Sequence, residues 1–379
     1  MQPKALCGRK LADSCARGWK YTSGTVRARH MPAKRGWVRP GRDGRWAGTA
    51  TIKAGFGGTP QILLGCAIVY AWCGSCFDFR GLQHPMGNSI TVMNAKGGVG
   101  KTTFVLAMAE TVSVHNELKV LVIDSDAHAS LSTMLLPGSW LATIQDQNRT
   151  FVDYLIAKVL RGASVDWRAF AVSGVSDVDD ARSIDLLIGG GHLTLFEREV
   201  SKGYHEAHLR HHIRAFLTDA AATYDLILID SAPGLSVLTE SWLREADFCL
   251  SPAKPDYLST RGLQFLHQFG ERDADMGFAQ NLGVVISMKD PHAPEDEQFA
   301  RWLRQNIKSR CFKQAIPRTT ALQTAAYFSA RRRSYAAKYP GKLGRVLREL
   351  ADELLARLAE AQTRDRGANP LWGKAAAAE

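Results

Sequence analysis

A glycine-rich segment between two lysines holds the residue types that bind phosphate. It reads Ala95-Lys-Gly-Gly-Val-Gly-Lys-Thr-Thr103. Its three glycines let the backbone curl so that successive N–H groups point at phosphate oxygens. Lys101 can then reach the β- and γ-phosphates of a nucleotide, and the Thr102 hydroxyl can ligate Mg²⁺. The segment predicts a site for a nucleotide and its metal ion.

The residues on either side supply the elements that such a loop requires. Residues 89–94 form a short strand-like run, and residues 104–112 follow the pattern of a helix. A strand, a glycine loop and a helix in this order bring the positive dipole end of the helix to the phosphates. An ordinary glycine turn is the competing interpretation, and this context disfavours it.

Two positions depart from the strict phosphate-loop pattern, since Ala95 replaces a glycine and Lys96 adds a second lysine. With these departures, residues 96–103 resemble the deviant Walker A motif of the ParA/MinD ATPases. The resemblance implies that ATP is the ligand and that Lys96 acts catalytically on a nucleotide held by a facing subunit of an ATP-dependent homodimer. The residues expected to contact the nucleotide are Lys96, Gly97, Gly98, Val99, Gly100, Lys101, Thr102 and Thr103.

Acidic residues follow an apolar run at residues 119–124, which predicts a buried parallel strand. In the resembled family, Asp124 would approach the Mg²⁺ shell and Asp126 would orient the attacking water as a catalytic residue. The family continues with Pro-Gln, whereas this chain has Ala127 and His128, which leaves the hydrolysis rate open. His128 is either a contact of the nucleotide or partner, or a partly exposed structural histidine.

A second carboxylate ends the apolar run at residues 224–230. With residues 231–234 this segment resembles the family's Walker B strand and switch. Asp230 would hold Mg²⁺ through water, because this cation keeps several waters beside phosphates. The alternative is an Asp that caps the next turn. The expected metal ligands are Thr102, Asp124 and Asp230.

Two more buried strands are predicted at residues 248–252 and 282–287, with a helix at residues 257–270 between them. These elements predict an α/β fold, a doubly wound and mainly parallel sheet of the P-loop NTPase type. Residues 287–290 do not match the guanine-reading pattern, because the lysine is one position late. Residues 315–320 resemble the family segment that flanks adenine, which implies that Pro317 contacts the base.

The C-terminal third predicts helices at residues 320–330 and 342–361. The second has an apolar face, which we expect to dock on the core rather than on a membrane, because acidic residues are mixed into its polar side. A basic cluster lies between and after these helices in an otherwise neutral region. ParA-type partition ATPases use C-terminal basic residues to bind DNA without sequence preference, so we expect contacts from Arg331, Arg332, Arg333, Lys338, Lys342 and Arg345. A solvated helix face is the alternative.

The net charge of +11 lies in the first 85 residues, which hold 14 Lys and Arg but three acidic residues. Residues 86–379 carry 34 basic and 34 acidic residues, so they form the expected ParA-like ATPase domain with no net charge. Residues 1–85 read as loop or disorder, and we expect Met86 to be the natural start after a non-native or disordered basic extension. The alternatives are an arm that binds nucleic acid, or half of a zinc site or a redox pair at Cys73 and Cys76.

Composition and resemblance together set the expected function. The 379 residues are 45% hydrophobic and 22% charged, which excludes a wholly disordered chain, and no apolar run reaches the ~18 residues of a membrane helix. We expect a cytoplasmic, nucleoid-associated ATP hydrolase that partitions plasmids or chromosomes, slowly and with stimulation by a ParB-like partner. The alternatives are positioning or assembly of a non-DNA cargo, and a nucleotide-dependent scaffold with little hydrolysis.

Overall fold

A computed structural model describes residues 19–22, 25–28, 87–272, 277–307 and 310–362. The chain divides into two compact units, Met1–Gly81 and Leu82–Glu379. In the first unit, β1 (Trp19–Thr22) pairs with β2 (Thr25–Ala28) in an antiparallel hairpin, which the sequence analysis did not anticipate. The expected start at Met86, the Cys73–Cys76 pair and most of the expected basic extension lie outside the described residues.

In the described part of the second unit, eight strands form one sheet in the order β10-β9-β8-β3-β7-β4-β6-β5. All neighbouring strands run parallel except β5 and β6. The fold class is therefore the predicted one. The strands are β3 (Asn88–Val92), β4 (Val120–Ser125), β5 (Ala171–Val172), β6 (Ile184–Leu187), β7 (Leu226–Ser231), β8 (Phe248–Ala253), β9 (Gln280–Lys289) and β10 (Cys311–Pro317).

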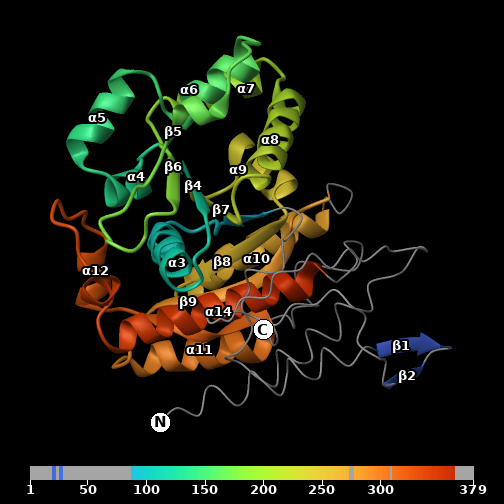
Figure 1. Ribbon diagram of the computed structural model, residues 1–379, viewed down its shortest axis with the longest axis vertical. Helices are drawn as coiled ribbons and strands as arrows, with labels where there is room; N and C mark the ends of the chain where they lie inside the picture. The colour runs from blue at the N-terminus through green and yellow to red at the C-terminus, as the bar shows by residue number, and fades with distance from the viewer. Residues whose placement is uncertain (1–18, 23–24, 29–86, 273–276, 308–309, 363–379) are drawn as a thin grey trace, which may run out of the picture. The chain divides into compact units, whose positions relative to one another are not determined.

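Helices cover both faces of the sheet (Figure 1). One face is covered by α3 (Lys101–His115), α4 (Ser130–Leu135), α5 (Gly138–Asp146), α12 (Thr320–Ala325), α13 (Tyr335–Lys338) and α14 (Lys342–Gln362). The other face is covered by α6 (Phe151–Leu155), η2 (Ile156–Leu160), η3 (Trp167–Phe170), α7 (Leu193–Lys202), α8 (Glu206–Ala221), α9 (Val237–Glu245), α10 (Tyr257–Arg272) and α11 (Pro294–Ile307).

The alternation of side chains along each strand explains why one sheet has two cores. In β4, Val120 and Val122 belong to the core that also contains α3 and α14, whereas Leu121 and Ile123 belong to the core that also contains α6, α8 and α9. All four are fully buried. A strand covered on both faces needs apolar residues at every position, which produces the continuous apolar run seen in the sequence.

The C-terminal helices differ in how well the sequence located them. The apolar face of α14 docks on the core as expected, with Leu347, Leu350 and Leu354 fully buried. The helix expected at residues 320–330 ends at Ala325, and the chain then turns towards Arg333, which forms a β-bridge with Val178. Among the described residues, no helix is both long and apolar enough to cross a membrane.

Candidate nucleotide site

The loop between β3 and α3 has the backbone conformation of a phosphate cradle. Gly98 and Gly100 have φ values of 70° and 85°, in the left-handed region that glycine adopts without strain. Gly100 precedes the first residue of α3, and no side chain caps this helix N-terminus. The amides of the first turn are therefore open to an anionic ligand at the positive end of the helix.

Neighbouring strand ends hold this loop in place. Val99 is fully buried, and its carbonyl accepts a hydrogen bond of 2.5 Å from the Ser287 hydroxyl at the end of β9. Gly97 faces Pro233, which follows β7. The cradle therefore rests on two strands from distant parts of the chain.

Lys101 is 7% exposed and lies among acidic side chains. Burial lowers the pKa of Lys101, while the charges of Asp230 and Asp126 oppose this shift. A desolvated ammonium beside a phosphate loop can interact strongly with a bound anion. The environment of Lys101 fits its expected contact with the β- and γ-phosphates.

Asp124 and Asp230 are in-register neighbours at the ends of β4 and β7. Asp124 accepts hydrogen bonds from the backbone N–H and the hydroxyl of Ser132, at 2.8 and 2.7 Å. Among the residues that the structure describes, none donates a hydrogen bond of normal geometry to Asp230, although the Thr102 hydroxyl lies close enough to lower its pKa. Burial raises the pKa of Asp124 to about 6, and burial followed by the charge of Asp124 raises that of Asp230 well above its usual value.

This pair of carboxylates fits a hard divalent cation. Burying two adjacent carboxylates is costly unless a positive charge compensates them, and Mg²⁺ prefers oxygen ligands such as these and the Thr102 hydroxyl. The described residues include no group of three or more His, Cys, Asp or Glu that could hold a metal alone. Phosphate and water oxygens would complete the shell, as is usual for Mg²⁺ beside a nucleotide.

Two residues of this site were not identified from the sequence. Ser132, in α4, orients Asp124 through the two hydrogen bonds above. Gly189 follows β6, and a Cβ atom there would lie 2.9 Å from the Asp124 carboxyl carbon and 2.7 Å from the Asp126 carbonyl oxygen. Glycine therefore permits the close approach of β6. The run of three glycines at 189–191 was the available signal.

Asp126 and His128 form a local pair in the segment after β4. One oxygen of Asp126 accepts the backbone N–H of His128 at 3.0 Å and lies 2.9 Å from the ring nitrogen Nδ1. The His128 side chain is 85% exposed, whereas that of Asp126 is 18% exposed. His128 thus belongs to the exposed surface and contacts the expected catalytic carboxylate.

Lys96 lies at the mouth of the loop, on the side of α10. Its ammonium nitrogen is 3.0 and 3.1 Å from the two carboxylate oxygens of Asp256 and 3.4 Å from the Ser259 hydroxyl. The Lys96 side chain is 29% exposed, in contrast to the buried Lys101. The two lysines of the motif therefore occupy different environments.

Pro317 lies on the same sheet edge as the loop. It pairs in register with Lys289, which follows Met288. Met288 adopts a left-handed φ of 54°, and its side chain lies 3.6 Å from the position a Cβ would take at Gly100. Pro317 is thus next to residues that border the phosphate loop, and its contact with the base stays a prediction.

The C-terminal basic cluster divides into exposed and buried members. Arg331, Arg332, Lys342 and Arg345 are exposed, whereas Lys338 is 2% exposed. The expectation that Lys338 contacts DNA is wrong, because its ammonium lies between Glu110 at 2.7 Å and Asp177 at 2.6 Å.

Arg333 also faces inward. Its guanidinium pairs with the fully buried Asp177 at 2.8 Å, and its side chain is 19% exposed. Buried charges need such partners, and the pairing withdraws Arg333 from the solvent-facing basic surface. The structure therefore leaves four residues of the expected set available to DNA.

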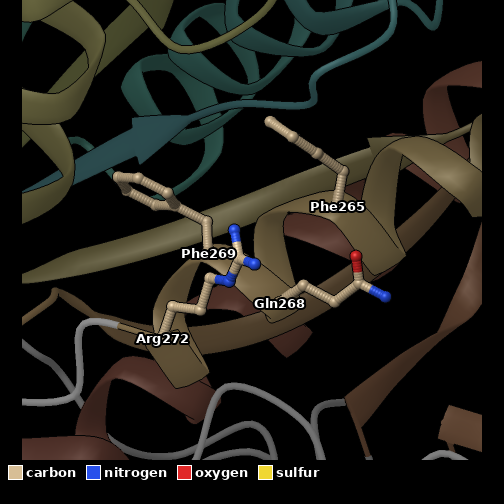
Figure 2. Close-up of a pocket in the computed structure, with 4 residues that line it drawn as sticks. All are labelled: Phe265, Gln268, Phe269 and Arg272. Atoms are coloured by element: carbon tan, nitrogen blue, oxygen red, sulfur yellow. The ribbon is translucent and has the colours of Figure 1, made fainter.

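A cavity of about 510 Å³ lies along α10. Figure 2 shows four side chains that line it, Phe265, Gln268, Phe269 and Arg272, projecting from successive turns of that helix. None of these four belongs to the residues predicted to bind nucleotide.

Comparison with known proteins identifies the family. Residues 87–275 match a family described as an AAA domain. The chain is 28% identical to the chromosome-partitioning ATPase Soj of Treponema pallidum over 72% of this chain and 98% of that protein.

Two solved structures share the fold. The first is a putative plasmid partition protein from Borrelia burgdorferi bound to AMPPNP, with a TM-score of 0.55, 20% identity and coverage of 71% of this chain and 99% of that one. The second is cobyrinic acid a,c-diamide synthase from Mycobacterium smegmatis with a bound ATP analogue and magnesium, with a TM-score of 0.55, 22% identity and coverage of 72% and 96%. The phosphate loop with its second lysine, the mainly parallel sheet and these relatives lead to one assignment: the chain belongs to the ParA/MinD-like P-loop ATPases.

Proposed function

We propose that the protein is an ATP-dependent switch that hydrolyses ATP to ADP and phosphate, and that two ATP-bound copies form a dimer. The observation that carries this proposal is the buried Asp124–Asp230 pair facing Lys101 and Thr102 at the open end of the phosphate loop. The buried carboxylate oxygens have few hydrogen-bond donors around them and suit a divalent cation, while the lysine and the helix N-terminus suit the phosphates of a nucleoside triphosphate.

Each residue then has a defined task. The N–H groups of the loop and Lys101 bind the phosphates, while Thr102, Asp124 and Asp230 would hold Mg²⁺. When bound, the cation would neutralise phosphate charge and orient the phosphate oxygens. Asp126 orients the attacking water. Hydrolysis is slow in this proposal, and the positioning of the water and the stabilisation of charge carry the reaction.

Lys96 acts on the nucleotide of the facing copy. Lys101 already occupies the position within the loop that reaches the β- and γ-phosphates, so Lys96 is free to serve a second nucleotide. A positive charge that a partner supplies at the transferring phosphoryl group stabilises the charge that develops there. Dimer formation and hydrolysis are thereby linked.

The cargo is plasmid or chromosomal DNA, and a ParB-like partner stimulates the ATPase at the nucleoid. The exposed residues Arg331, Arg332, Lys342 and Arg345 support non-specific contact with phosphates. The similarity to the chromosome-partitioning ATPase Soj of Treponema pallidum also supports a role in partition. A ParA-like ATPase for a non-DNA cargo and a scaffold with little hydrolysis are the alternatives, and they differ in measurable ways.

The test compares ATP binding, dimer mass and single-turnover hydrolysis in three variants of the full chain. Lys101→Ala should abolish ATP binding, whereas Lys96→Ala should bind ATP as a monomer without dimerising or hydrolysing it. Asp126→Ala should accumulate as the ATP dimer. A monomeric Asp126→Ala protein in excess ATP would remove Asp126 from its catalytic role, and equal loss of ATP affinity in both lysine variants would contradict their division of tasks.

Two further readouts separate the alternatives. Negligible single-turnover hydrolysis by the wild-type protein, with normal ATP-dependent dimerisation, would favour the scaffold. Normal hydrolysis and dimerisation without any ATP-dependent binding of duplex DNA would favour a non-DNA cargo.

A further inference from the structure

The ammonium group of Lys96 is fully engaged within its own subunit. It faces both carboxylate oxygens of Asp256, at 3.0 and 3.1 Å, and the hydroxyl of Ser259 at 3.4 Å. A lysine ammonium has three N–H donors and accepts no hydrogen bonds. These three acceptors therefore match its whole donor capacity, and none remains for a phosphate.

The two residues that hold Lys96 are themselves fixed. Asp256 accepts the backbone N–H of Ser259 at 2.7 Å and so caps the first turn of α10. Burial raises the pKa of Asp256, but the hydrogen bonds from Ser259 and Lys96 outweigh it and lower that pKa below its usual value. Asp256 is therefore an ionised partner for Lys96 at neutral pH, built into a helix end.

The backbone around Lys96 is fixed by hydrogen bonds of Asn94 and lies in close contact with α10. The side-chain oxygen of Asn94 accepts the N–H of Lys96 at 2.9 Å, and its amide donates to the carbonyl of Pro252 at 2.8 Å. Gly262 of α10 comes so close that a Cβ there would lie 2.5 Å from that Asn94 oxygen and 3.4 Å from the Cβ of Lys96. The absence of a side chain at Gly262 is what lets this helix reach the start of the loop.

From this geometry we infer that Asp256 and Ser259 are positioning residues that hold Lys96 against its own subunit and compete with the nucleotide of the facing copy for its ammonium. The inference rests on the proposed action of Lys96 across a dimer. One ammonium cannot satisfy both sets of acceptors, so each subunit must release its Lys96 when the dimer closes. The threshold for dimerisation therefore depends on the strength of the contact with Asp256.

The test uses Asp256→Asn in the full chain. The amide oxygen of Asn can still cap α10, while the negative charge that holds Lys96 is lost. Partly exposed ion pairs change an equilibrium by about 1.4- to 5-fold, and a dimer breaks two of them, so its ATP-dependent dissociation constant should fall roughly 2- to 30-fold. Asp166→Asn is the matched control, since Asp166 caps η3 and pairs with Arg168 far from this site in sequence.

The second readout is the chemical reactivity of the Lys96 amine towards acetic anhydride without nucleotide, relative to the exposed Lys342. It should rise several-fold in Asp256→Asn and to a smaller extent in Ser259→Ala, and it should stay unchanged in Asp166→Asn. If Asp256 only capped α10 and did not bind the Lys96 ammonium, its substitution would not alter this ratio of reactivities. Unchanged reactivity in Asp256→Asn would overturn the inference.

Dimerisation separates a failure of this inference from a failure of the proposed function. If Lys96→Ala dimerises with ATP as the wild type does, the action of Lys96 across the dimer is wrong. If Lys96→Ala stays monomeric but Asp256→Asn dimerises no better than the wild type, only the competition is wrong. Weaker dimerisation of Asp256→Asn would instead mean that Asp256 supports Lys96 in the closed dimer.

Discussion

Asp124 and Asp230 destabilise the nucleotide-free protein because both are buried with little compensating charge. A carboxyl group whose pKa is raised by folding contributes stability below its unfolded pKa, and this contribution is lost as the pH rises through the folded value. For Asp124 the folded value is about 6. The protein without nucleotide should therefore lose stability between about pH 4 and pH 7, and Mg²⁺ with ATP should restore it.

Asp230→Asn tests this directly. At pH 7.5 it should raise the free energy of unfolding of the nucleotide-free protein by more than the ~0.5 kcal/mol of an ordinary surface substitution, because the neutral amide avoids burying a charge beside Asp124. The gain should largely vanish at pH 4, and stabilisation by Mg²⁺ with ATP should be lost. Urea unfolding measures all three. The exposed Asp146→Asn should change stability by less than about 0.5 kcal/mol, and a destabilised Asp230→Asn protein would refute the charge argument.

His128 replaces the residue that the family usually carries and touches Asp126 through both its backbone and its ring. His128→Ala should slow single-turnover hydrolysis about 2- to 10-fold, which corresponds to one lost hydrogen bond that orients a carboxylate. ATP affinity should stay unchanged, because His128 is exposed and remote from the phosphate loop in sequence. His211→Ala, at another exposed histidine, is the control. A hydrolysis rate of His128→Ala equal to that of the wild type would mean that His128 does not help to orient Asp126.

At the level of single residues, the sequence located what is local and missed what is distant. The phosphate loop lies within nine consecutive residues, so its spacing could be read directly. Ser132 and Gly189 contact Asp124 from other elements, and Asp256 meets Lys96 from 160 positions away. Such contacts depend on strand order and helix placement, which no local pattern specifies.

The helix α3 links the nucleotide site to a buried charge network. Glu110, about midway along it, accepts hydrogen bonds from Lys338, Ser176 and Tyr339, while Asp177 pairs with Lys338 and Arg333. Two acids and two bases thus neutralise one another. The network fastens the segment that carries Arg331 and Arg332 to the helix that follows the phosphate loop.

Lys338→Met should lower the free energy of unfolding by about 3–5 kcal/mol at pH 7.5, because it leaves Glu110 buried without its cation. Denaturant unfolding at pH 7.5 measures this change. The control is Lys342→Met, which removes an exposed lysine at the start of α14 and should change the free energy of unfolding by less than about 0.5 kcal/mol. An equally small effect of both variants would contradict the role of the network.

Element prediction succeeded where burial or amphipathic patterning was strong. The buried parallel strands at the centre of the sheet were identified as apolar runs, and α14 by its apolar stripe. The edge strand β5 and its neighbour β6 were not predicted, because two and four residues hold too little pattern. Lys338 was wrongly assigned to the DNA-binding surface, because the sequence of a four-residue helix does not reveal which of its sides faces the core. Lys338 faces inward because Glu110 and Asp177, both buried, are its partners.

At the scale of the whole molecule, the exposed basic residues Arg331, Arg332, Lys342 and Arg345 belong to the segment after α12 and to α14. A dimer of two such surfaces offers up to eight phosphate contacts. A protein that makes about 6–10 such contacts loses about 10³-fold or more of its DNA affinity when the salt concentration rises from 50 to 200 mM. The protein should therefore bind unrelated duplexes equally, only with ATP, and steeply less at higher salt.

Changing Arg331 and Arg332 together to Glu tests which surface binds. Both are exposed and lie outside the buried network, so the fold and basal ATP turnover should be preserved while ATP-dependent DNA binding falls at least tenfold and its salt dependence weakens. The control makes the same charge change with Arg198→Glu and Lys202→Glu on α7, which lies at the far end of the domain from α14 (Figure 1). Equal losses in the two double variants would mean that net charge alone governs binding, and no loss in the first would move the DNA contact to another surface.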